Sequence, residues 1–140
     1  MHDVLLDSDV IIEVLRGNKG VLEEVISLGK SGRAILYTPI SKAEIYHGIR
    51  KGETGHAEAL FSGCMSVPIT DEIGEKAGRY LRQFHKSHGT DIADALIAAA
   101  AFINNAGLFT FNHKHFPMKH IKLHKIKLGR QGIIPTPPKK

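Results

Sequence analysis

Acidic residues are missing from the last third of this chain of 140 residues. All 14 Asp and Glu residues lie at or before Asp94, whereas the segment from Ala95 to Lys140 carries eight Lys and Arg residues. The first 94 residues therefore have a net charge of −3, whereas the whole chain has a net charge of +5. This asymmetry suits a protein that gathers carboxylates in one place and attracts phosphate in another. A solvated basic segment would give the same pattern.

Cysteine and long apolar runs are also scarce. The single cysteine, Cys64, excludes an internal disulfide and fits a reducing cytoplasm. No apolar run approaches the roughly 20 residues that span a bilayer. The segment from Met1 to Asp7 lacks the basic region and long apolar stretch of a signal peptide. We therefore expect a cytoplasmic protein that has no membrane partner.

What the chain does contain is an alternation of strand and helix patterns. Strands are predicted over 3–6, 34–37 and 108–111, with weaker candidates over 65–69 and 121–128. Helices are predicted over 10–15, 21–28, 41–50, 56–61, 70–88 and 91–104. Such alternation predicts an α/β fold, with a central parallel sheet between two layers of helices. We expect one domain over 1–134 and a flexible C-terminal tail over 135–140.

Four acids follow or precede apolar segments at positions that a parallel sheet would bring together. Asp7 ends the first strand, Glu44 lies early in the helix after the second strand, and Asp91 and Asp94 begin the helix over 91–104. Ligands of open parallel sheets bind beyond the carboxyl ends of the strands. Each acid also has a purely structural interpretation. Ser41 and Glu44 match a capping box, either Asp7 or Asp9 suits the N-cap of the first helix, and Asp91 suits the N-cap of the helix that contains Asp94.

Taken together, these acids predict a cation site. Several carboxylates at one sheet edge repel each other unless a cation lies among them. Mg²⁺ and Mn²⁺ prefer oxygen ligands and leave positions free for a phosphate. Such a site can polarise a phosphodiester and stabilise its leaving oxygen.

Four segments resemble the ordered motifs of PIN domains, and the chain has the length of VapC-type toxins. Residues 5–12 (LLDSDVII) resemble the opening motif, and residues 40–49 (ISKAEIYHGI) resemble the motif that contributes a glutamate. Residues 94–99 (DALIAA) and 108–112 (LFTFN) are similar to the third and fourth motifs. Any one motif is weak, but the ordered set covers nearly the whole chain.

The resemblance implies a PIN-like three-layer fold and a Mg²⁺- or Mn²⁺-dependent endoribonuclease that acts as the toxin of a toxin–antitoxin pair. It implies RNA as substrate, a cognate antitoxin as partner and a homodimer. Carried over by position, Asp7, Glu44 and Asp94 are the metal-binding and catalytic carboxylates. Ser8 and Asn112 support the site or contact phosphate.

The chain departs from the family at His115, where many relatives carry an aspartate. Asp91 is one candidate for the missing catalytic charge. His115 is another candidate as a metal ligand, or it is simply a residue of the pocket.

Two other interpretations remain open at this stage. His85 with His88, and His113 with His115, have the spacing of zinc-binding pairs, but no Cys cluster or His-Glu-x-x-His motif accompanies them. The chain could also be a non-catalytic module that binds RNA or protein through the basic segment and keeps a degenerate acidic pocket. Against a platform for single-stranded RNA, it has no Trp and only 6% aromatic residues.

Overall fold

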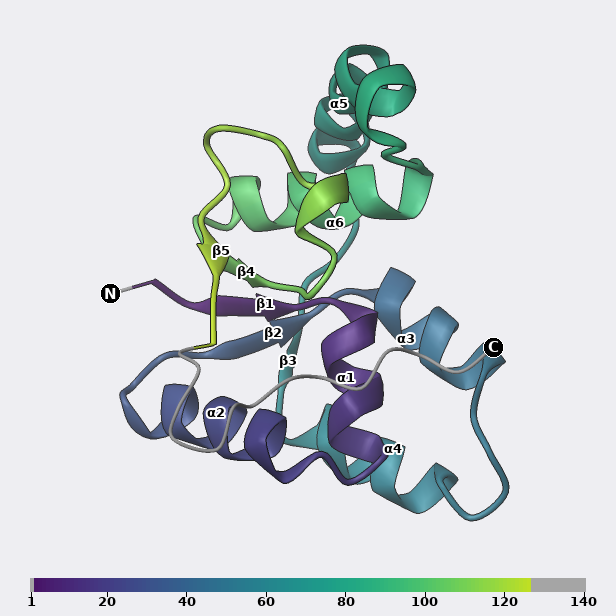
Figure 1. Cartoon of the computed structure of the whole chain (residues 1–140), viewed down its shortest axis with the longest axis vertical. Helices are drawn as coiled ribbons and strands as arrows, with labels where there is room; N and C mark the ends of the chain where they lie inside the picture. The colour runs from purple at the N-terminus through teal and green to yellow at the C-terminus, as the bar shows by residue number, and fades with distance from the viewer. Residues whose placement is uncertain (1, 127–140) are drawn as a thin grey trace.

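Five short strands form one sheet in the computed structural model, which describes residues 2–126. The strands are β1 (Val4–Leu6), β2 (Ile35–Tyr37), β3 (Met65–Ser66), β4 (Gly107–Phe109) and β5 (Leu123–His124). Their order across the sheet is β3-β2-β1-β4-β5, and every neighbouring pair is parallel (Figure 1). The predicted parallel sheet is confirmed.

Helices cover both faces of this sheet. One face carries α1 (Ser8–Leu15), α2 (Lys19–Lys30), α3 (Pro39–His47) and α4 (Thr54–Ser62). The other carries α5 (Asp71–His88) and α6 (Ile92–Ile103), and the short 3-10 turn η1 (His113–His115) follows β4. Figure 1 shows these two layers above and below the sheet, so the three-layer α/β/α prediction is confirmed. Within residues 2–126, no helix is long and apolar enough to cross a membrane.

The central strand β1 divides its side chains between two cores. Val4 and Leu6 are buried with α1 to α4, whereas Leu5 is buried with α5 and α6. Successive residues of a strand point to opposite faces, so a strand covered on both sides must be apolar throughout. This explains the continuous apolar run at the N-terminus.

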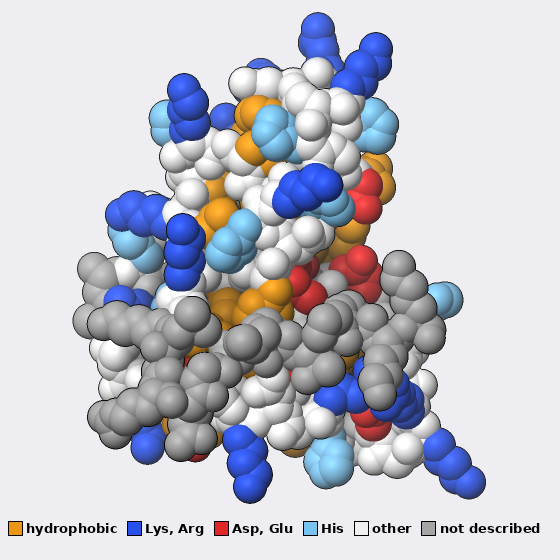
Figure 2. Space-filling view, viewed as in Figure 1, with side chains coloured by type: hydrophobic (Ala, Val, Ile, Leu, Met, Phe, Trp, Pro, Cys, Tyr) orange, Lys and Arg blue, Asp and Glu red, His pale blue; other side chains and the backbone are white. Residues whose placement is uncertain are grey.

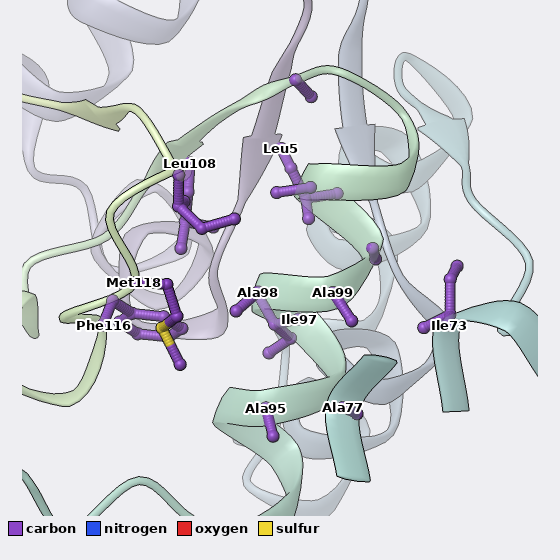
Figure 3. Packing of buried hydrophobic residues seen from close by; sticks show 14 of the residues in the cluster. Leu5, Ile73, Ala77, Ala95, Ile97, Ala98, Ala99, Leu108, Phe116 and Met118 are labelled. Atoms are coloured by element: carbon purple, nitrogen blue, oxygen red, sulfur yellow. The ribbon is translucent and has the colours of Figure 1, made fainter. Parts of the chain in front are cut away.

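Helix α6 packs closely because its buried face is built from alanine. Ala98 and Ala99 are both fully buried, and Figure 3 shows them beside Ile97 near the labelled core residues of α5 and β1. Small side chains let the α6 backbone approach both the sheet and α5 without leaving voids. The start of α6 is thereby fixed against the edge of the sheet.

Several predicted boundaries need correction. Helix α3 begins at Pro39, because Thr38 is its N-cap and the Thr38 side chain accepts a hydrogen bond from the amide of Ser41 at 3.2 Å. Ser41 therefore lies inside the helix, and its interpretation as the cap of a Ser41–Glu44 capping box is wrong. Of the predicted strand over 121–128, only β5 forms. Residues 127 and 128 of that prediction lie outside the described part of the chain, as does the predicted tail over 135–140.

Candidate functional site

A carboxylate and a hydroxyl meet directly beyond the carboxyl ends of β1 and β4. Leu6 and Phe109 are partners in the β1–β4 register, so the residues that follow them, Asp7 and Thr110, lie opposite each other. Asp7 is buried as the N-cap of α1, and its Oδ1 accepts a hydrogen bond from the amide of Ser8 at 2.8 Å. Asp7 Oδ2 accepts a bond from the Thr110 hydroxyl at 2.8 Å. The prediction that Asp7 caps a helix is confirmed, and both its oxygens have one donor.

Asp9 points to the same place from the first turn of α1. Its Oδ2 accepts a hydrogen bond from the Phe111 amide at 3.0 Å and lies 3.4 Å from the Thr110 hydroxyl. Its other oxygen, Oδ1, is buried and has no hydrogen-bond partner. A buried carboxylate oxygen without a partner is costly, because it has lost its hydration and gained nothing in return.

Asp94 faces this pair from the N-terminus of α6. Asp91 is the N-cap of α6 and accepts a bond from the Asp94 amide at 2.9 Å, while Asp94 Oδ2 accepts one from the Asp91 amide at 3.2 Å. This reciprocal capping box confirms the prediction that Asp91 is an N-cap. Asp91 itself is exposed, whereas the Asp94 side chain keeps only 13% of its surface accessible.

Glu44 contributes the fourth acid from α3. It is exposed and lines the groove between α1 and α3, together with Ile12 and Ile45. Its charge is close enough to raise the pKa of Asp7. Asp7, Asp9, Glu44 and Asp94 are called the acid cluster below, and Figure 2 shows carboxylates gathered between α6 and the pair formed by α1 and α3.

The electrostatics of the acid cluster are unfavourable when all its members are ionised. Burial, followed by the charge of Asp9, raises the pKa of Asp7 from 3.8 to about 7. Burial is also the largest cause that raises the pKa of Asp9 and of Asp94, each to about 6, and the charge of Asp94 adds to the shift of Asp9. Carboxyl groups whose pKa values are raised in this way keep their protons to a higher pH than free carboxyl groups do, unless a cation replaces the protons.

The other predicted site residues surround the acid cluster. Ser8 is half-buried and donates its amide to Asp7. Asn112 is exposed, its amide donates to the Thr110 hydroxyl at 3.1 Å, and its side chain lies 2.7 Å from His115 Nδ1. His115 Nδ1 also lies 3.2 Å from Asp94 Oδ2. The structure therefore brings His115 to the site, at Asp94.

Sequence reasoning missed Asp9 and Thr110 as members of the site. Asp9 was interpreted only as a possible helix cap. A usable signal existed for Thr110: it follows an apolar strand as Asp7 does, so neighbouring parallel strands place the two residues side by side. For Asp9, the position in the first turn, two residues after Asp7, gave no such signal.

In the first of the two predicted zinc pairs, each histidine has another partner for its Nδ1 nitrogen. His85 Nδ1 lies 2.9 Å from the Thr90 carbonyl oxygen, and His88 Nδ1 lies 2.7 Å from the Ser87 hydroxyl. Within residues 2–126, no three His, Cys, Asp or Glu side chains are already placed to hold a metal ion together. Bringing Glu44 and Asp94 onto one ion with Asp7 thus requires side-chain rotation.

Comparison with known proteins shows which family the chain resembles. The PIN domain family matches residues 4–120. Ribonuclease VapC19 of Mycobacterium tuberculosis is 34% identical, over 81% of this chain and 92% of that relative. Ribonuclease VapC10 of the same organism is also 34% identical, over 82% of this chain and 86% of that relative.

Solved structures agree with this fold. The VapBC2 structure from Rickettsia felis, bound to a DNA fragment from its promoter, matches with a TM-score of 0.76 at 20% identity, over 89% of this chain and 98% of that one. DNA-bound VapBC from Salmonella typhimurium gives a TM-score of 0.72 at 18% identity, with the same two coverages. At these identities the likeness concerns the fold.

Proposed function

Because the chain belongs to the PIN-domain family, we propose that it is a metal-dependent endoribonuclease and the toxin of a toxin–antitoxin pair. The observation that carries this proposal is the acid cluster, in which a buried Asp9 oxygen has no partner and burial raises the pKa of three carboxyl groups. The names of the two ribonuclease relatives support RNA as the substrate.

The residues of the acid cluster fit Mg²⁺ or Mn²⁺. All their donor atoms are carboxylate oxygens, the ligands that these hard cations prefer. Asp7, Glu44 and Asp94 would hold the ion, and the orphaned Oδ1 of Asp9 adds a further oxygen. The chemistry supplied by such a cation when bound is polarisation of the scissile phosphodiester and stabilisation of the leaving oxygen.

The remaining residues position the acids and the RNA. The Thr110 hydroxyl donates to Asp7, and the Phe111 amide fixes the neighbouring Asp9. Asp91 acts through Asp94, which its capping box holds at the start of α6. Ser8 and Asn112 lie beside the acid cluster, where a hydroxyl and an amide can donate to phosphate oxygens.

The basic segment after Asp94 attracts the phosphates of the RNA backbone. Four exposed lysines belong to its described part: Lys114, Lys119, Lys122 and Lys125. Lysines that contact phosphate give affinity with little sequence selectivity and strong salt dependence. The choice of RNA then depends on the shape of the surface around the acid cluster.

The toxin role implies a protein partner and a place in the cell. The fold matches chains of toxin–antitoxin complexes, which supports a cognate antitoxin. Our candidate for the antitoxin-binding site is the apolar groove between α1 and α3, which is lined by Ile12, Leu15 and Ile49 beside Glu44. An antitoxin segment bound there would cover Glu44. We also propose a homodimer and a cytoplasmic location, which size-exclusion chromatography and cell fractionation test.

Cleavage of a panel of labelled RNAs by the purified, antitoxin-free chain tests the function. We expect cutting in Mg²⁺ or Mn²⁺, none in EDTA, and none by the Asp94→Asn variant. Binding of RNA without cutting, in protein shown to bind Mn²⁺, would favour the non-catalytic module instead.

A further inference from the structure

The side of the site that faces Asp94 is built by a histidine in place of an acid. Residues after Asp94 include no Asp or Glu, so β4 and η1 bring no carboxylate to this position. What they bring is His115, whose Nδ1 lies 3.2 Å from Asp94 Oδ2.

The imidazole of His115 is held in place from several directions. Its carbonyl oxygen accepts a hydrogen bond from the hydroxyl of the fully buried Thr90 at 2.9 Å, which ties η1 to the start of α6. The next residue, Phe116, is buried in the core shared with α6. On the ring itself, Nδ1 lies 2.7 Å from the Asn112 side-chain amide. The ring nitrogen nearest Asp94 is thus fixed by the fold.

We propose that His115 Nδ1 is a nitrogen ligand of the cation held by Asp94, and that it makes the site prefer Mn²⁺ over Mg²⁺. This inference rests on the proposed metal-dependent function. Two ligands on adjacent corners of an octahedron, each about 2.1 Å from the ion, lie about 3 Å apart. The separation of 3.2 Å between Asp94 Oδ2 and His115 Nδ1 matches that edge.

Asn112 belongs to the same arrangement. Its side-chain atom is 2.7 Å from His115 Nδ1, and the oxygen and nitrogen of an amide exchange places by rotation of the group. With the oxygen turned inward, Asn112 presents an oxygen donor on one side of His115 Nδ1, and Asp94 Oδ2 lies 3.2 Å from that nitrogen. A neutral nitrogen ligand favours Mn²⁺ over Mg²⁺, because Mg²⁺ is the harder cation and gives up its water reluctantly.

The same distances also fit a simple hydrogen bond between His115 and Asp94, so the test must detect coordination of the ion by the imidazole nitrogen. We would bind Mn²⁺ to the full chain, freed of antitoxin, and record electron spin-echo envelope modulation with natural-abundance and ¹⁵N-labelled histidine. A coordinated imidazole gives a ¹⁴N modulation that changes to that of ¹⁵N on labelling. We expect this signal in the wild type and its loss in His115→Gln.

Metal affinities provide the second readout. We expect His115→Gln to bind Mn²⁺ about tenfold more weakly. We expect His115→Asp to lower the ratio of Mn²⁺ to Mg²⁺ affinity about tenfold, because an oxygen donor replaces the nitrogen. His113→Gln is the matched control: His113 is exposed on the same turn, and its replacement should change neither the modulation nor the affinities.

The outcomes separate the two proposals. Bound Mn²⁺ without histidine modulation in the wild type would overturn the role of His115 and leave the metal-dependent function standing. Failure of the wild type to bind Mn²⁺ at all would overturn both. An Mn²⁺ to Mg²⁺ ratio unchanged in a folded His115→Asp variant would refute the proposed metal preference.

Discussion

Replacing Asp7 by Asn should stabilise the metal-free protein. Asp7 is buried beside Asp9, and its pKa is raised from 3.8 to about 7. Asn keeps a carbonyl oxygen for the Ser8 amide, and its NH₂ group can donate to the Thr110 hydroxyl, which then turns toward Asp9. The substitution therefore removes the buried charge and preserves the local hydrogen bonds.

The size of this effect follows from the pKa of Asp7. A rise of about three units, at about 1.4 kcal/mol per unit, gives at most about 4 kcal/mol for ionising Asp7 in the folded state. A proton taken up by Asp9 relieves part of the same repulsion, so we expect a gain of about 2–4 kcal/mol at pH 8. This corresponds to a rise in Tm of about 6–15 °C for a chain of this size.

The gain should depend on pH in a defined direction. As the pH rises from about 4 to about 7, the unfolded chain releases the Asp7 proton before the folded chain does. Wild-type stability therefore falls over this window, and the Asp7→Asn advantage at pH 5 should be about half of that at pH 8.

Urea unfolding in EDTA at pH 5 and pH 8 measures the stability gain of Asp7→Asn over the wild type. Glu58→Gln, a change at an exposed position on α4, is the matched control and should leave the pH dependence unaltered. An Asp7→Asn variant no more stable than wild type at pH 8 would refute the electrostatic reasoning.

Three further substitutions test individual hydrogen bonds and the packing of the fold. Thr110→Val removes the hydroxyl that donates to Asp7 and should cost about 2 kcal/mol in urea unfolding; no loss would mean that the bond is unimportant. Ala98→Leu inserts a large side chain where α6 is fully buried and should cost about 1–3 kcal/mol, whereas an unchanged Tm would contradict the close packing. Thr70→Ala removes the cap of α5 and should cost about 1 kcal/mol, which chemical denaturation checks against Thr70→Ser, expected to be near neutral.

The sequence carried enough information for the sheet and for most of the acid cluster. Apolar runs that end in a carboxylate or hydroxyl mark the carboxyl ends of parallel strands, and Asp7 meets Thr110 for this reason. The error at α3 came from placing the helix start at Ser41 when the helix begins at Pro39. A threonine followed by proline is also a helix start, because proline at the first helical position loses no hydrogen bond.

The missing parts of the site depend on contacts far apart in the sequence. Asp9 is turned toward the Phe111 amide, 102 positions away, so its place follows from the packing of α1 on the sheet. His115 reaches Asp94 through the 3-10 turn after β4, a local geometry that hydrophobic periodicity does not encode.

Cleavage kinetics of the Glu44→Gln variant test the central claim most directly. Glu44 is exposed, so we expect this substitution to leave the fold intact while it removes one proposed cation ligand. On an RNA that the wild type cuts in Mn²⁺, we expect Glu44→Gln to lose at least about 100-fold in rate at a Tm no lower than that of the wild type, with Glu58→Gln as fast as wild type. Equal rates for Glu44→Gln and wild type would contradict the assignment of the acid cluster as the nuclease centre.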